Sequence, residues 1–168
     1  MNLTLRPETA SDAESIGHLT AAAFRDLPYS SHTEQFIVAA LRRAGQLTVS
    51  LLAEEDGVIV GHVAISPVTI SSGAAGWYGL GPISVAPARQ RQGIGSQLMA
   101  AALAELRGRG GRGCVLLGDP AYYARFGFRH QPGLELPGVP QQYFQALSFS
   151  EEWPLGTVQY HRAFAATA

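Results

Sequence analysis

The most constraining feature of the sequence is a glycine-containing turn between a predicted strand that ends at Val85 and a predicted helix that begins near Gly95. Pro87 prevents the strand from continuing, and Gly93 permits the tight backbone turn that opens the helix. The first amides of such a helix have no intrahelical acceptor, and the helix dipole adds about half a positive charge at the same end. The segment therefore predicts a site at which backbone amides bind an anion such as a diphosphate.

The segment after this turn has the period of an amphipathic helix. Its small and apolar residues recur on one face, namely Gly95, Leu98, Met99, Ala102, Leu103 and Leu106. We expect Gly95 to lie on this buried face and to allow close packing on the sheet, so that a large residue there impairs both binding and folding. Arg89 and Arg91 are expected to add positive charge to the anion site.

Two other phosphate-binding motifs fit the turn less well. A dinucleotide-binding fingerprint requires G-x-G-x-x-G, but Leu98 occupies the position of the third glycine. A Walker loop requires a lysine, and the chain contains none. A glycine turn without a ligand and a regulator that binds another nucleotide stay open as rival interpretations.

The remaining patterns predict a mixed sheet with helices on both faces. Period-two segments predict strands at residues 3–6, 47–54, 58–66, 68–71, 78–85 and 156–162, and a short apolar run predicts a buried strand at 114–117. Helices are expected from Ser11, with a capping box between Ser11 and Glu14, from about 31 to 45, and at 121–126. The expected fold class is α/β, as an α+β mixed sheet that is largely antiparallel, in a single domain over residues 1–168.

Composition excludes several classes of protein and partner. A chain of 168 residues fits one domain, since domains cluster around about 100–150 residues. The net charge of −1 indicates no nucleic-acid partner and no membrane partner, and no apolar run reaches the roughly 18 residues of a spanning helix. The single cysteine, Cys114, indicates no disulfide within the chain and no metal site. We expect a cytoplasmic protein.

The turn carries a family resemblance. Gln90-x-x-Gly93-x-Gly95 resembles the Q/R-x-x-G-x-G/A signature of the GCN5-related N-acetyltransferases, the GNAT family, and lies between a strand and a long helix as it does there. The resemblance implies a GNAT fold and acetyl-CoA as the cofactor, with its pyrophosphate on the amides of 91–96 and its pantetheine arm along 83–85. The implied cofactor-binding residues are Ile83, Ser84, Val85, Gln90, Arg91, Gln92, Gly93, Ile94, Gly95 and Ser96.

A second motif, from Tyr123 to Phe128, resembles the Y-x-x-x-G-F segment of the same family. The resemblance implies that Tyr123 is the catalytic general acid, which protonates the thiolate that aminolysis of a thioester expels. Such a role contributes about 10²–10⁴-fold to a rate. Tyr122 is the adjacent alternative. Many relatives carry an Asn where this chain has Leu117, and Asp119 is expected to cap the helix that follows.

The acceptor is implied to be a small-molecule or peptide amine. A lysine-like amine is neutral in only about one molecule in 2,500 at pH 7, a handicap of about 4.6 kcal/mol, so a base or a desolvating pocket is expected. Glu34 and His62 are candidates, but the sequence assigns no base. Aromatic residues in or beside predicted loops, where acceptor specificity would be built, are Tyr29, Trp77, Tyr78, Tyr143 and Phe144, and ordinary packing is expected to explain most of them. The sequence leaves two possibilities open. One is that the protein forms a homodimer, and the other is that it is a non-catalytic acyl-CoA-binding or sensing module.

Overall fold

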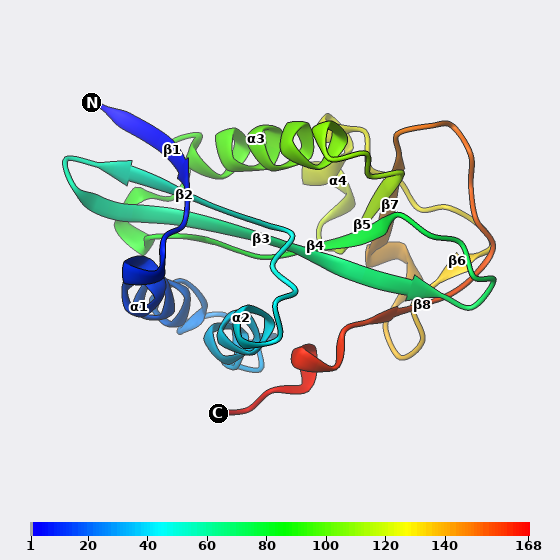
Figure 1. Cartoon of the computed structure of the whole chain (residues 1–168), viewed down its shortest axis with the longest axis horizontal. Coiled ribbons are helices and arrows are strands. Elements are labelled where there is room, and N and C mark those ends of the chain that lie inside the picture. The colour runs from blue at the N-terminus through cyan, green and yellow to red at the C-terminus, as the bar shows by residue number, and fades with distance from the viewer. Residues whose placement is uncertain (1) are drawn as a thin grey trace.

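The computed structural model describes residues 2–168, and its centre is a twisted sheet (Figure 1). The strands follow the spatial order β1-β2-β3-β4-β5-β7, and β8 pairs with the far half of β3 and with β6. Their bounds are β1 Leu3–Pro7, β2 Val49–Glu55, β3 Val58–Ile70, β4 Trp77–Val85, β5 Gly113–Leu117, β6 Leu134–Glu135, β7 Phe144–Ser148 and β8 Gly156–Tyr160. Pairing is antiparallel except between β4 and β5 and between β6 and β8.

Helices cover both faces of this sheet, as the sequence predicted (Figure 1). One face carries α1 (Ala13–Phe24) and α2 (Glu34–Arg43), and the other carries α3 (Ile94–Gly108) and the short α4 (Pro120–Tyr123). A short 3-10 turn follows α4 at Ala124–Phe126. Another, η5, lies near the C-terminus at Arg162–Ala165. The mixed and mostly antiparallel architecture is therefore confirmed.

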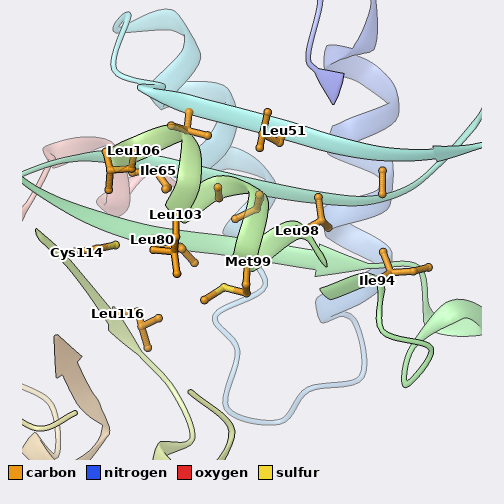
Figure 2. Packing of buried hydrophobic residues seen from close by; sticks show 14 of the residues in the cluster. Leu51, Ile65, Leu80, Ile94, Leu98, Met99, Leu103, Leu106, Cys114 and Leu116 are labelled. Atoms are coloured by element: carbon orange, nitrogen blue, oxygen red, sulfur yellow. The ribbon is translucent and has the colours of Figure 1, made fainter. Parts of the chain in front are cut away.

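The main core lies between α3 and the sheet. Figure 2 shows Leu98, Met99, Leu103 and Leu106 of α3 in one cluster with side chains of β2, β3 and β4, such as Leu51, Ile65 and Leu80. These residues are buried, and a fully buried Leu or Met side chain stabilises a fold by about 1.5–3 kcal/mol. The helical period read from the sequence therefore identifies the face that fixes α3, and with it the turn before α3, against the sheet.

One strand prediction is wrong, because 58–66 and 68–71 form a single strand, β3. Pro67 has no backbone N–H to donate to a ladder. However, Pro67 lies where the outer neighbour of β3 changes. Pairing with β2 ends at Ile65, and pairing with β8 begins at Val68, so the missing amide costs no ladder bond on that side.

The predicted capping box is also displaced. Instead of Ser11 and Glu14, the box joins Thr9 and Asp12, and the backbone N–H of Thr9 donates to Asp12 Oδ2 at 2.7 Å. Arg6 donates to both oxygens of the same carboxylate at 2.8 and 3.0 Å, and these hydrogen bonds hold the pKa of Asp12 well below its usual range. The pair fixes the start of α1 to β1.

The strand β7 was missed, and two of the loop aromatics have the packing role that was expected of most of them. Phe144 belongs to β7 and is 2% exposed, and Trp77 begins β4 and is 4% exposed. Both pack in a second core cluster with Val115 and Val158 rather than beside a loop. They therefore stabilise the β5 to β8 region and do not line an acceptor site.

Candidate active site

The strands β4 and β5 are paired only where they begin. Their parallel ladder joins Trp77, Tyr78 and Gly79 to the first residues of β5, and within residues 2–168 no strand pairs with this edge of β4 beyond Gly79. The backbone from Leu80 onward therefore presents polar groups without a ladder partner on that side, which a ligand can satisfy.

A β-bulge lies at this opening. Val63 of β3 pairs with Ile83, and Ile65 pairs with Leu80, so β4 carries one residue more than β3 between these pairs. Leu80 and Ile83 consequently both pack on the core beneath α3, although strict alternation would place them on opposite faces. Bulges of this kind redirect the backbone beside functional sites.

A cavity of about 660 Å³ fills the gap between the diverging strands. Its walls are residues 80–83 of β4, residues 116–119 at the end of β5, the tyrosines of α4, and side chains from α1, α2 and η5. Elements from both helical layers thus meet in one cavity.

The turn before α3 has the conformation that the sequence predicted. Gly93 is the N-cap residue with φ of 84°, and Arg91 has φ of 64°. The first amide to bond back into the helix is that of Gln97, which donates to Gly93 O at 3.1 Å. The amides of residues 94–96 therefore precede the first helical hydrogen bond and are available to an anion.

Side chains fix this turn to the sheet. The Gln90 side-chain amide donates to Val85 O at 3.2 Å, which joins the turn to the end of β4. Arg89 donates to the two carboxylate oxygens of Glu55 at 2.7 and 3.0 Å, and this contact lowers the pKa of Glu55. Arg89 was expected to add charge to the anion site. Its charge is instead offset by Glu55, so its role is to hold the turn against β2.

The expectation that Gly95 lies on the buried face of α3 is wrong, whereas the expected effect of a large residue there stays a prediction. The buried face of the first turn of α3 is supplied by Ile94, which is 2% exposed, whereas Gly95 is only half-buried. A Cβ at Gly95 would lie 3.7 Å from Val85 Cγ2 and 3.8 Å from Tyr122 Oη, which are ordinary contacts. Close packing therefore does not require glycine at this position.

The helix α4 brings Tyr122 next to the turn. Asp119 caps this helix as expected, and its Oδ1 accepts from the Ala121 N–H at 3.0 Å. The Tyr122 hydroxyl lies 3.1 Å from Ser96 Oγ, so α4 contacts the start of α3. The contact between Ser96 and Tyr122 therefore joins the anion site to the wall of the cavity.

Tyr123 lines the cavity itself. Its ring packs edge-on against Phe128 with 6.3 Å between centroids, and a Cβ at Gly118 would lie only 2.3 Å from the ring. Burial raises the pKa of Tyr123, and the nearby Tyr122 raises it further. The phenol therefore keeps its proton at neutral pH and is a proton donor.

The two candidate bases lie in different places. Glu34 lines the cavity, and its carboxylate oxygens lie 2.7 and 2.8 Å from Ser30 Oγ. His62 is fully buried outside the cavity wall, with Nε2 2.8 Å from Ser50 Oγ, and burial lowers its pKa to about 4. His62 therefore takes no direct part at the cavity.

The three residues predicted to bind the pantetheine arm have different surroundings. Ile83 lines the cavity, whereas Val85 lies beside Gly95. Ser84 is 2% exposed and is paired with His62 across the strands, so only its backbone faces a ligand at the free edge. Phe24 and Phe164 complete the cavity wall. Sequence reasoning missed both, because no local pattern joins residues so far apart.

The model of the Acetyltransferase (GNAT) family matches residues 13–128. The chain belongs to this family. In residues 2–168 no helix is long and apolar enough to cross a membrane, and no group of three or more His, Cys, Asp or Glu side chains could hold a metal ion.

Solved and curated relatives agree with this assignment. A GNAT family acetyltransferase from Brucella melitensis, solved in complex with acetyl-CoA, is 52% identical, with a TM-score of 0.87 over 97% of this chain and 98% of that one. YhbS from Escherichia coli, solved in complex with CoA, has a TM-score of 0.89 over 100% of this chain and 94% of its own. The uncharacterized N-acetyltransferase YhbS of strain K12 is 34% identical over 170 residues, which cover 96% of this chain and 98% of YhbS.

Proposed function

We propose that this chain, folded as a single domain over residues 1–168, transfers an acetyl group from acetyl-CoA to a primary amine by direct aminolysis. The observation that carries the proposal is the cavity between β4 and β5, which lies next to the amide-rich start of α3 and contains Tyr123. The complexes of the two solved relatives with acetyl-CoA and CoA support the choice of cofactor.

The residues present fit the two ends of this cofactor. The amides from Arg91 to Ser96 would hold the diphosphate, and each anionic contact at a helix start contributes about 0.3–1 kcal/mol. Gln90 fixes this turn, and Gln92 is exposed beside it. The backbone edge of β4 from Ile83 to Val85 would hold the pantetheine amides, because no strand in the described part of the chain pairs with it.

The chemistry follows from the protonation state of Tyr123. The bound thioester supplies the acetyl group: the amine nitrogen bonds to its carbonyl carbon, the carbon–sulfur bond breaks, and the sulfur leaves as a thiolate. Tyr123 holds a proton at neutral pH and donates it to that sulfur. The ammonium form of the acceptor first loses one proton to solvent, which frees the nitrogen lone pair for attack. After the carbon–nitrogen bond has formed, the nitrogen loses a second proton, which restores the phenol.

The test is the substitution Tyr123→Phe. It should lower kcat by about 10²–10⁴-fold and leave the Kd for acetyl-CoA unchanged, because the ring remains and only the proton donor is lost. Thiol release across a broad amine panel measures kcat, and calorimetry measures Kd. Tyr143→Phe is the matched control, since Tyr143 is exposed and lies outside the cavity wall.

The outcomes separate the alternatives. An unchanged kcat in Tyr123→Phe, with a large loss in Tyr122→Phe, would move the general acid to Tyr122. Binding of acetyl-CoA without transfer to any amine would indicate a non-catalytic acyl-CoA-binding module. Tight binding of NAD or ATP with no response to acetyl-CoA would contradict the transferase proposal.

A further inference from the structure

The cavity between β4 and β5 has one half on each side of the sheet. Tyr122 and Tyr123 line it from the side of α3, where the proposed diphosphate site lies. Phe24, Ile37 and Phe164 line it from the side of α1 and α2. Because acetyl-CoA would enter past the start of α3, the half beneath α1 and α2 is left for the acceptor. We call this half the acceptor chamber.

The wall of the acceptor chamber is apolar and aromatic. Phe164 stacks on Tyr160 with 4.8 Å between ring centroids, and it packs against the same small cluster as Ile37. Leu27 and Pro82 add further apolar surface. An apolar ligand that covers such a wall gains about 25 cal/mol for each Å² removed from water, whereas a polar group placed against these apolar side chains loses hydration.

Every charged side chain that lines the whole cavity is a carboxylate. These carboxylates belong to Glu34 and Asp119. Within the described chain, no arginine and no histidine lines the cavity. Asp119 is already engaged as the cap of α4. Glu34 forms no ion pair in the described part of the chain, so its negative charge is available to a ligand.

The carboxylate of Glu34 is held in place by the loop before α2. Both of its oxygens lie within 2.8 Å of Ser30 Oγ, and that oxygen also accepts the backbone N–H of His32 at 2.9 Å. A carboxylate whose position is fixed loses less conformational entropy when it binds a cation than a mobile one does. The chamber thus combines one oriented anion with an apolar wall.

We infer that the acceptor is a primary amine with an apolar body and no anionic group, and that Glu34 binds its ammonium. This inference rests on the proposed function and adds the substrate class to it. An amine that also carries a carboxylate is disfavoured, because that carboxylate would find no cationic partner in the cavity and would be repelled by Glu34.

Matched pairs of amines test the substrate class. With saturating acetyl-CoA, kcat/KM for 2-phenylethylamine should exceed that for phenylalanine by at least about tenfold, since the two differ by one carboxylate. Phenylalanine amide, which has the same body without the charge, should behave like 2-phenylethylamine. Hexylamine and 6-aminohexanoate form an aliphatic pair with the same expected order, and 1,6-diaminohexane replaces the apolar end by a second cation and should be poorer than hexylamine.

Failure of this inference differs from failure of the proposed function. Preference for the carboxylated members, or acetylation of a lysine peptide with neither apolar amine accepted, would overturn the substrate class while showing acetyl transfer. If calorimetry shows acetyl-CoA binding but no member of the panel is acetylated, the substrate class is also overturned. A protein that fails to bind acetyl-CoA, or that binds it and acetylates no amine of any class, would remove the basis of both.

The variant Glu34→Gln tests the residue. It keeps the shape and the contact with Ser30 but removes the charge, so KM for 2-phenylethylamine should rise about 10- to 100-fold, as expected for loss of a charged hydrogen bond. KM for acetyl-CoA should not change, and discrimination against phenylalanine should shrink. Glu14→Gln, on the exposed side of α1, is the control. An unchanged KM for the amine, in a variant with a native urea midpoint, would overturn the assignment of Glu34.

Discussion

The two glycines of the cofactor turn should respond in opposite directions to the same substitution. Gly93 has φ of 84°, and no atom of residues 2–168 lies within 4 Å of a Cβ built there, so Gly93→Ala adds backbone strain without a clash. An L-residue in this region costs about 1–2 kcal/mol, and the reduced entropy of the unfolded chain returns about 0.5 kcal/mol. The free energy of unfolding should therefore fall by about 1 kcal/mol.

Gly95→Ala is the matched variant. Gly95 is helical, and its added Cβ would make contacts of 3.7 and 3.8 Å, so the methyl group fits. Alanine replaces glycine favourably inside a helix by about 0.5–1 kcal/mol, and the first turn should show the lower figure, a gain of about 0.5 kcal/mol. Acetyl-CoA binding should persist in this variant.

Urea unfolding of the free protein measures both effects. At an unchanged slope of free energy against urea, the two variants should differ by about 1.5 kcal/mol, with the native protein between them. In thermal unfolding this corresponds to about 3–6 °C for a chain of this size. The reasoning is refuted if Gly93→Ala is as stable as the native protein, or if both substitutions shift stability in the same direction.

Two further predictions concern Tyr123 and His62. Gly118→Ala should lower kcat by about tenfold or more without weakening acetyl-CoA binding, because its Cβ would lie 2.3 Å from the Tyr123 ring and must displace it. An unchanged kcat in the thiol-release assay would contradict this. Burial lowers the pKa of His62 from 6.5 to about 4, so the unfolded chain takes up the proton first as the pH falls, and stability should decline by up to about 3 kcal/mol between pH 6.5 and 4. Urea unfolding across this range should show a shallower decline in His62→Gln, and an equal decline in both proteins would exclude His62 as a cause.

Features set by adjacent residues were predictable from the sequence. The Gly93 turn has its positive φ, and Asp119 caps α4. In each case a local backbone requirement selects the residue type. The turn next to the site could therefore be located without a structure.

Features set by distant partners were not predictable. The strand β7 was missed because Gln145 interrupts its apolar pattern, yet Gln145 is 1% exposed and its side-chain amide donates to Gly118 O at 2.9 Å. Likewise, the partner of Arg89 is Glu55, which belongs to another strand. The cavity exists because β4 and β5 stop pairing after Gly79 and diverge. The hydrophobic periodicity of the sequence does not show where two strands stop pairing.

A crystal structure of this protein with acetyl-CoA tests the proposed site directly. The proposal predicts that the diphosphate accepts hydrogen bonds from backbone amides between Arg91 and Ser96, and that the thioester sulfur lies within hydrogen-bond distance of the Tyr123 hydroxyl between β4 and β5. Acetyl-CoA bound away from the start of α3, or with its sulfur outside that cavity, would contradict it.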